Sequence, residues 1–269
     1  MTVALALLEA VETITIGRTT EVTWTGPNGP SDYITVVAPG AGDSEFGAYA
    51  YTSSGSPARI RVPDKSGTYE LRYVTGKESR VLARRSVIAL AAETSIHAPG
   101  SAPAGSPIEI VWTGPDNEGD FVTIVKPAAA NSDFTAYFYT HGMSPERGTL
   151  PLPGKAGTYE VRYVSGQSNE ILARGTVEAA AVTATLEAPD SVKAGTKLAV
   201  RHTGPKYAGA YVTIVLEGAP RGSYLDYFYT ESAGPTGELD VPAKPGAYEL
   251  RYVLKDDEIL TSRKILVVP

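Results

Sequence analysis

Polar and apolar residues alternate with a period of two along short stretches of this chain, which is the pattern of half-buried β-strands. In residues 20–25 the alternation places Val22 and Trp24 on one face, and residues 32–37 form a run rich in β-branched side chains. Turn signals separate such stretches at intervals of roughly 8–12 residues, and no stretch has the period of an amphipathic helix. The pattern therefore predicts an all-β protein built from antiparallel β-sandwiches of about seven strands each.

One eight-residue string occurs three times, at intervals of roughly 90 residues. It reads Gly-Thr-Tyr-Glu-Leu-Arg-Tyr-Val at residues 67–74 and returns with small changes at residues 157–164 and 246–253. The segments on either side of it return in the same order. Three tandem copies of one domain are therefore predicted, over residues 1–91, 92–180 and 181–269.

The segments that join the repeats, residues 89–92 and 179–181, are short and rich in alanine. They contain no Gly/Ser or Pro run, so they give the chain little slack. We expect the last strand of one repeat to lead almost directly into the next repeat, in an elongated array with limited bending. Residues 3–8 align with the first strand of the later repeats and lack the basic flank of a signal peptide. Met1 is therefore interpreted as the start of a mature or excised piece.

Composition narrows the classes of function. The 269 residues carry a net charge of −6, which argues against a nucleic-acid partner because proteins of that class present a basic face. The sequence has no cysteine, so disulfides, thiolate chemistry and Cys-ligated metals are excluded. No apolar run reaches the roughly 18 residues of a membrane span. We expect neither nucleic-acid binding nor a membrane-spanning segment.

The repeated string has the alternation of a strand, with Tyr69, Leu71 and Tyr73 on one face. Tyr69 follows a Pro-containing loop and comes two positions after a turn-forming glycine. This arrangement resembles the tyrosine corner of immunoglobulin-like domains, in which the phenol hydrogen-bonds to the backbone upstream. Where antibody-type domains have a cysteine two residues later, the three repeats have Leu71, Val161 and Leu250. An aliphatic core is therefore expected in place of the disulfide.

The opposite face of the same strand carries a Glu and an Arg, two residues apart, in every repeat. We interpret these side chains as an outward, solvated face with ion pairs that contribute at most about 1 kcal/mol each. The alternative is a recurrent arginine that binds a ligand. One candidate partner for the arginine is an aspartate, present as Asp32 and Asp120 and replaced by Ala210 in the third repeat. The candidate contact arginines are Arg72, Arg162 and Arg251.

A second candidate surface comes from a strand in which two tyrosines flank one residue. In repeats two and three the middle residue is a phenylalanine, which is expected to face the core and so to turn both tyrosines outward. An outward pair is a rigid aromatic strip suited to contact with a peptide or a glycan, whereas an inward pair is packing. Both interpretations remain open. The residues of the candidate strip are Tyr137, Tyr139, Tyr227 and Tyr229.

Catalytic constellations are not recognisable. His97, His141 and His202 fall at different positions in their repeats, and no Gly-x-Ser-x-Gly elbow or phosphate-cradling glycine loop is present. Acidic residues cluster at 116–120 and 256–258, without the ligand spacing of an EF-hand. A structural calcium ion in these loops is an alternative to ordinary solvated loops. We predict a non-enzymatic protein with no catalytic residue, no cofactor and no metal ligand.

Several motifs together resemble a bacterial repeat: Trp-Thr-Gly-Pro, the Asp-aromatic strand, Tyr-x-Tyr-Thr, and the octapeptide followed by (Val/Ile)-Leu-Ala-Arg. Along essentially its whole length the chain is similar to the immunoglobulin-like repeats found beside von Willebrand factor A domains in secreted or periplasmic proteins of proteobacteria. The resemblance transfers no catalytic residue. The A domain itself, with its metal-binding Asp-x-Ser-x-Ser, is absent from this sequence.

The resemblance implies a structural or interaction module of the bacterial cell envelope, which spaces or presents a partner domain and binds protein, as in adhesion. The partner would be another protein or a covalently linked neighbouring domain, and exposed edge strands could allow self-association. A periplasmic or extracellular location is implied, while a cytoplasmic one stays open. Two other functions remain: a glycan-binding module that uses the tyrosine strips, and an accessory region of a larger enzyme.

Overall fold

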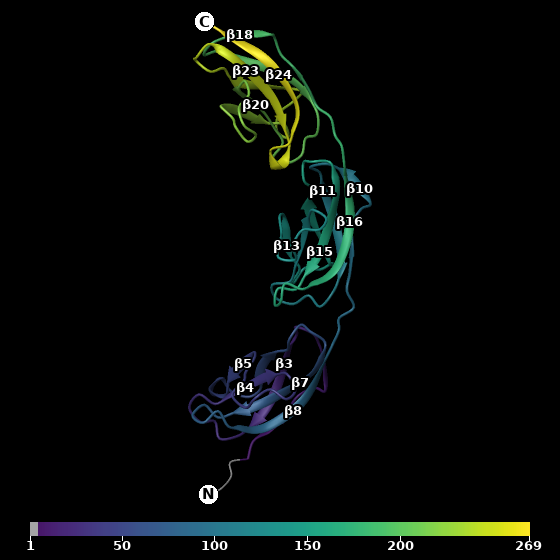
Figure 1. The fold of residues 1–269 in the computed structure, drawn as a ribbon, viewed down its shortest axis with the longest axis vertical. Helices are drawn as coiled ribbons and strands as arrows, with labels where there is room; N and C mark the ends of the chain where they lie inside the picture. Colours follow the sequence, from purple (N-terminus) through teal and green to yellow (C-terminus); the bar gives the residue numbers. More distant parts are fainter. Residues whose placement is uncertain (1–4) are drawn as a thin grey trace.

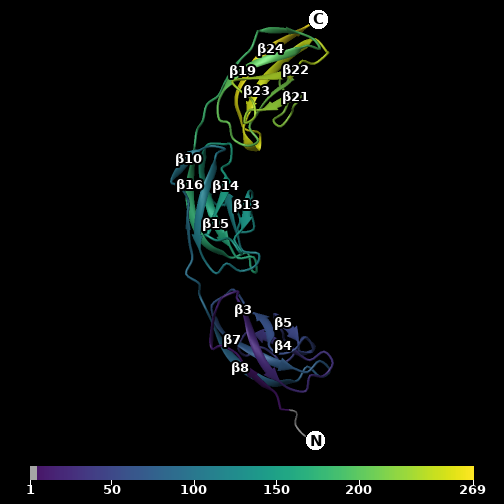
Figure 2. The same cartoon turned by 180° about the vertical axis from the view of Figure 1, so that it is seen from behind.

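The computed structural model describes residues 5–269 as three β-sandwich domains in a curved, elongated array (Figures 1 and 2). Each domain contains one three-stranded sheet and one five-stranded sheet. The all-β, immunoglobulin-like fold predicted from the alternation and the repeat is confirmed. The predicted first strand begins in residues 1–4, which lie outside the described residues. The part of it that is described forms β1 (Leu7–Glu9).

Domain 1 defines the topology that the other two domains share. Its small sheet has the order β1-β3-β6, and its large sheet has the order β2-β8-β7-β4-β5. The octapeptide is β7, the central strand of the large sheet. After β1, the strands of domain 1 are β2 (Thr13–Thr15), β3 (Thr19–Thr25), β4 (Tyr33–Val37), β5 (Tyr49–Tyr51), β6 (Ala58–Arg61), β7 (Gly67–Val74) and β8 (Val81–Leu90).

Domains 2 and 3 repeat this order of strands. Domain 2 contains β9 (Ser95–His97), β10 (Ser101–Pro103), β11 (Pro107–Thr113), β12 (Phe121–Val125), β13 (Tyr137–Tyr139), β14 (Arg147–Pro151), β15 (Gly157–Val164) and β16 (Ile171–Ala180). Domain 3 contains β17 (Thr185–Glu187), β18 (Ser191–Lys193), β19 (Lys197–Thr203), β20 (Tyr211–Leu216), β21 (Asp226–Tyr229), β22 (Thr236–Asp240), β23 (Gly246–Val253) and β24 (Ile259–Val268).

Within the part of the chain that the structure describes, each domain has eight strands, one more than the seven expected, because its first strand is divided between the two sheets. In domain 2, β9 pairs antiparallel with β11, whereas β10 pairs parallel with β16 in the other sheet. Pro99 lies between β9 and β10, and Pro189 lies between β17 and β18. A proline cannot donate to a ladder and so favours a break at such a position.

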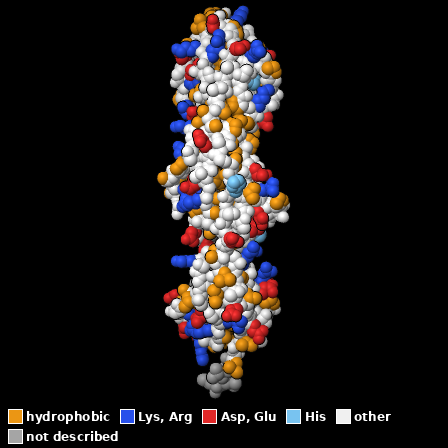
Figure 3. Space-filling model, turned by 90° about the vertical axis from the view of Figure 1, so that its right-hand side faces the viewer, with side chains coloured by type: hydrophobic (Ala, Val, Ile, Leu, Met, Phe, Trp, Pro, Cys, Tyr) orange, Lys and Arg blue, Asp and Glu red, His pale blue; other side chains and the backbone are white. Residues whose placement is uncertain are grey.

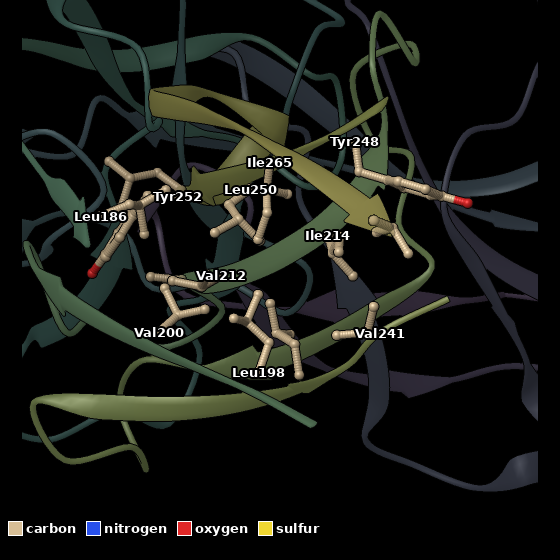
Figure 4. Packing of buried hydrophobic residues seen from close by; sticks show 14 residues of the cluster. Leu186, Leu198, Val200, Val212, Ile214, Val241, Tyr248, Leu250, Tyr252 and Ile265 are labelled. Atoms are coloured by element: carbon tan, nitrogen blue, oxygen red, sulfur yellow. The ribbon is translucent and has the colours of Figure 1, made fainter. Parts of the chain in front are cut away.

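The inner faces of the two sheets form the hydrophobic core of each domain, and in domain 1 a second, small cluster is formed by Ile16, Val62 and Ala89. In domain 3, Leu198 and Val200 from the small sheet pack against Val212, Ile214 and Leu250 from the large sheet (Figure 4). The aliphatic residues expected in place of the disulfide cysteine, at positions 71, 161 and 250, have no exposed surface. The prediction that they form the core of a cysteine-free sandwich is therefore confirmed.

The tyrosine corner is present in all three domains. The hydroxyl of Tyr69 donates to the carbonyl of Lys65 at 2.8 Å, and the hydroxyl of Tyr159 donates to that of Lys155 at 2.8 Å. In domain 3 the corresponding bond, from Tyr248 to the carbonyl of Lys244, measures 2.9 Å. Each phenol therefore closes the loop four residues upstream, as the resemblance implied.

The two joints between domains use equivalent surfaces. The strands on either side of each joint are separated only by residues 91–94 and 181–184, in agreement with the expected short joints. At the first joint, Asn117 Nδ2 donates to the carbonyl of Ile16 at 3.2 Å, and Arg61 donates to the carbonyl of Glu118 at 3.1 Å. These polar contacts oppose bending between domains 1 and 2.

The second joint places apolar side chains where the first has polar ones. Leu254, at the position of Ser165 in the repeat, is 1% exposed. It lies against Gly105 and Gly154 of domain 2, where an added Cβ would lie 3.4 and 3.1 Å from its side chain. The same two ends of the sandwich therefore meet at both joints, with different chemistry.

Domain 3 has His202 in its core at the position that Trp24 and Trp112 occupy in the other domains. Its ring is 4% exposed and lies 5.4 Å from the ring of Phe228. Neither ring nitrogen has a hydrogen-bond partner among the described residues. Burial, together with the nearby charge of Lys206, lowers the pKa of His202 below its ordinary value.

We expect domain 3 to lose stability as the pH falls below about 6.5, the ordinary pKa of histidine. The pKa of His202 is lowered in the folded state, so below this pH the unfolded chain binds more protons than the folded one and unfolding is favoured. Hydrogen exchange of the full chain, resolved by peptide, should show protection of residues 185–268 falling between pH 7.5 and 5. The variant His202→Phe should remove most of this dependence. If it leaves the dependence unchanged, other groups are responsible.

Candidate ligand-binding clefts

Each domain exposes four aromatic rings at one place, beside the edge strand of its large sheet. We call each set an aromatic cleft. One ring comes from the first residue of the neighbouring strand, one from the loop that follows it, and two from the edge strand itself. The clefts consist of Tyr33, Phe46, Tyr49 and Tyr51 in domain 1, Phe121, Phe134, Tyr137 and Tyr139 in domain 2, and Tyr211, Tyr224, Tyr227 and Tyr229 in domain 3.

The tyrosines of the predicted strip lie on the outer face of the sheet. Tyr137 and Tyr139 are 46% and 58% exposed, whereas Phe138 between them points inward and contacts Trp112. Tyr227 and Tyr229 have the same orientation in domain 3. This is the direction that strand alternation predicts. Whether the tyrosines contact a partner stays a prediction.

The rings of each cleft hold one another in edge-to-face contact. In domain 2, Phe134 lies 5.5 Å from Tyr137 at an interplanar angle of 86°, and Tyr137 lies 5.5 Å from Tyr139 at 78°. Domains 1 and 3 have the same chain of contacts. Such pairs contribute about 0.5–1.5 kcal/mol each, so the clefts are ordered before any ligand arrives.

Four of the cleft phenols, those of Tyr33, Tyr51, Tyr211 and Tyr227, have raised pKa values and remain protonated at neutral pH. The neighbouring phenol of Tyr229 raises the pKa of Tyr227, and that of Tyr49 raises the pKa of Tyr51. Burial raises the pKa of Tyr33 and of Tyr211. Each cleft therefore combines aromatic surface with hydroxyl groups that both donate and accept hydrogen bonds.

The rings line a concave cavity in each domain, with a volume of about 220 Å³ in domain 1, 470 Å³ in domain 2 and 310 Å³ in domain 3. The rest of the lining is neutral in the first two domains: Ser31 and Gly76 in domain 1, and Gly119, Asn131, Ser132, Gly166 and Asn169 in domain 2. In domain 3 one charged group, Asp257, joins the lining. Aromatic walls with a few convergent polar groups are typical of ligand sites.

The candidate arginines do not project from a solvated face, and that expectation is wrong. Arg72, Arg162 and Arg251 are only 0–5% exposed. Arg162 donates to Glu160 and to the carbonyls of Ala130 and Ala129, at 2.5, 2.7 and 2.8 Å. The two carbonyls belong to the loop before the edge strand, which folds back over the outer face of the sheet. The arginines are therefore unavailable to a partner.

The buried arginine instead positions the loop that completes the cleft. In domain 1, Arg72 donates to the carbonyls of Ala41 and Gly42 at 2.6 Å each, and this loop carries Phe46. Arg251 holds the carbonyls of Ala219 and Pro220 in the same way. Glu70 and Glu160 link this arginine to Arg84 and Arg174 of the neighbouring strand, whereas in domain 3 Glu249 pairs with Arg251 on its own strand. The octapeptide therefore supports the cleft from beneath.

In domains 1 and 2 the cleft glutamate is kept ionised by two arginines. Burial alone would raise the pKa of Glu160, but hydrogen bonds and charges from Arg162 and Arg174 outweigh it and hold the pKa below its ordinary value. Glu70 has the same balance with Arg72 and Arg84. The ion pairs are therefore formed at neutral pH and carry no free charge into the cleft.

The loop aromatics Phe46, Phe134 and Tyr224 are part of the clefts and were missed from the sequence. All three lie three residues before the first tyrosine of the edge strand. They are 63%, 57% and 61% exposed. Their recurrence at one position of the repeat was the signal that could have identified them.

The aspartates considered as partners for the arginines have a different role. Asp120 accepts hydrogen bonds from the hydroxyl of Tyr163 at 3.2 Å and from the backbone amides of Asn117 and Gly166. Asp32 makes the equivalent bonds with Tyr73 and two loop amides. These carboxylates tie two loops to the central strand. Across residues 5–269, no group of three or more acidic or histidine side chains is arranged to hold a metal ion.

No protein-family model matches this sequence, and no curated protein sequence matches it. Solved structures with similar shapes include the chicken CNTN1 FN1–FN3 domains, with 10% identity, a TM-score of 0.27 and 99% of both chains covered. Dpr2 Ig1–Ig2 in complex with DIP-Theta Ig1–Ig3 gives 12% identity and a TM-score of 0.25, covering 98% of this chain and 99% of that one.

A third similar structure is the native conformation of Escherichia coli alpha-2-macroglobulin, with 11% identity and a TM-score of 0.27. It covers 99% of this chain, which corresponds to 23% of that protein. Within residues 5–269, no helix is long and apolar enough to cross a membrane.

Proposed function

We propose that this chain is a non-enzymatic interaction module in which each of three immunoglobulin-like domains offers an aromatic cleft to a binding partner. The observation that carries the proposal is the recurrence of the same four-ring cleft at the same place in every domain. Rings that served only to pack the domain would be buried. Exposed aromatic patches rimmed by polar groups are typical of interaction surfaces.

The groups around the clefts are suited to binding. Phenols, amides and backbone groups can orient a ligand, and the aromatic faces can bury its apolar surface. The rings are held by one another and by the loop that the buried arginine fixes to the sheet. A partner would therefore meet a preformed surface, and little ordering cost would oppose association.

The setting of the module is a further part of the proposal. The motif resemblance to repeats found beside von Willebrand factor A domains supports a secreted or periplasmic bacterial protein in which these domains space or present a neighbour. The short joints support such a spacer, because they resist bending between domains. Fractionation of the native host tests this location: recovery in the periplasm or medium is expected, and recovery only in the cytoplasm would contradict it.

The binding role is tested by removing one ring from each cleft in the full chain. The variant Tyr49→Ala/Tyr137→Ala/Tyr227→Ala is compared with a control, Ile88→Ala/Val111→Ala/Leu266→Ala, which removes exposed aliphatic side chains outside the clefts. Labelled proteins are applied to an array carrying both peptides and glycans, after circular dichroism has shown that both variants are folded. We expect the cleft variant to lose at least tenfold in signal on every ligand bound, and the control to keep it. Equal signals from the two variants would overturn the proposal.

A further inference from the structure

The three clefts lie on one side of the array. The edge strands β5 and β13 and the sheet edge that carries β21 all lie on the concave side of the curve, and the two opposite views agree (Figures 1 and 2). On the convex side, charged side chains of both signs are scattered along all three domains (Figure 3). The edge strands that carry the clefts therefore lie on the same side of the array, with one cleft per domain. Concave surfaces of this kind suit extended ligands.

The lining of the clefts indicates the chemistry of the ligand. Among residues 5–269, no charged side chain lines the clefts of domains 1 and 2, and Asp257 is the one charged group that lines the cleft of domain 3. What the lining offers is aromatic surface together with hydroxyl and amide groups. A neutral sugar ring matches both, because its C–H face packs on an aromatic ring and its hydroxyls both donate and accept hydrogen bonds.

The edge strands argue against a peptide that adds to the sheet. Such a peptide gains its affinity from a row of backbone hydrogen bonds along an exposed edge. Here the edge strands β5 and β13 are only 3 residues long and β21 only 4. What the edge offers instead is side-chain surface: the rings pack edge to face, and neighbouring rings are turned nearly perpendicular to one another.

We propose that the clefts bind a neutral polysaccharide that runs along the concave side and occupies the clefts of successive domains. This inference rests on the proposed binding role of the clefts and names their ligand class. One cleft would hold a short stretch of sugar residues weakly. A polymer held in one cleft would present its next segment to the neighbouring cleft at a raised effective concentration, so the whole chain binds far more tightly than one cleft does.

Affinity electrophoresis of the full chain through gels containing laminarin, yeast mannan, dextran or xylan tests the proposal, with a proline-rich peptide measured in parallel by calorimetry. We expect retardation by at least one polysaccharide. A short oligosaccharide of the same sugar should compete at least tenfold more weakly. Tyr137→Ala alone should weaken retardation in part, and the triple cleft variant should abolish it. The triple control variant should behave as the wild type.

The outcomes separate the ligand class from the binding role. Binding of the peptide but of no polysaccharide, lost in the triple cleft variant, would overturn the polysaccharide proposal and leave the binding role standing. Polysaccharide binding that survives in the triple cleft variant would overturn both. Equal affinity for the polymer and for a short oligosaccharide would overturn the occupation of successive clefts. Binding of neither probe would overturn the polysaccharide proposal, and the peptide and glycan array would then decide the binding role.

Discussion

Replacing Arg162 by alanine is expected to lower the free energy of unfolding of domain 2 by about 3–5 kcal/mol, the cost of breaking a buried ion pair by removing one partner. The guanidinium is 1% exposed and holds one carboxylate and two loop carbonyls. Without it, the carboxylate of Glu160 keeps only the exposed Arg174. The carbonyls of Ala129 and Ala130 lose their donors beneath the loop.

Urea denaturation of the full chain, followed by tryptophan fluorescence, measures this effect. The sequence has 2 tryptophans, so a Trp24→Phe background leaves Trp112 as the reporter of domain 2. Arg174→Ala is the matched control, because this arginine contacts the same carboxylate but is 48% exposed. It should cost no more than about 1 kcal/mol. If the two variants lose the same stability, the buried arginine does not anchor the loop.

The octapeptide shows which structural features the alternation of polar and apolar residues can predict and which it cannot. Alternation correctly placed Tyr69 and Leu71 toward the core and Arg72 on the opposite face. It could not show that a loop covers that opposite face. The acceptors of Arg72 in the loop are the backbone carbonyls of Ala41 and Gly42. Any residue supplies such carbonyls, so the contact leaves no trace in the side chains of the loop and the arginine seemed solvated.

For a related reason, only part of each cleft could be predicted from the sequence. The edge-strand tyrosines stood out because they form a short periodic pattern. Phe46, Phe134 and Tyr224 lie in loops whose other residues differ between repeats, so alternation does not apply to them. Only their register relative to the edge strand is constant. The joints are similar: Asn117 and Ser165 are replaced by Tyr207 and Leu254, so the shared geometry of the two joints is not visible as a shared motif.

Replacing Trp112 by alanine is expected to lower the free energy of unfolding of domain 2 by about 3–5 kcal/mol, the usual cost of removing a large buried aromatic side chain. The indole is 1% exposed and lies 5.2 Å from the ring of Phe138. Its Nε1 has no hydrogen-bond partner among the described residues. The loss is therefore one of packing, because the variant leaves a cavity between the two sheets beneath the edge strand.

Trp24→Ala is the matched control, at the same position of the repeat in domain 1. Its indole is only half-buried, and its Nε1 donates to the carbonyl of Gly55 at 3.1 Å. It should lose one hydrogen bond, worth about 1 kcal/mol, and less packing than Trp112. Hydrogen exchange resolved by peptide compares residues 95–180 in one variant with residues 7–90 in the other, without a tryptophan reporter. Equal losses would mean that the position, and not the burial of its side chain, determines its contribution to the core.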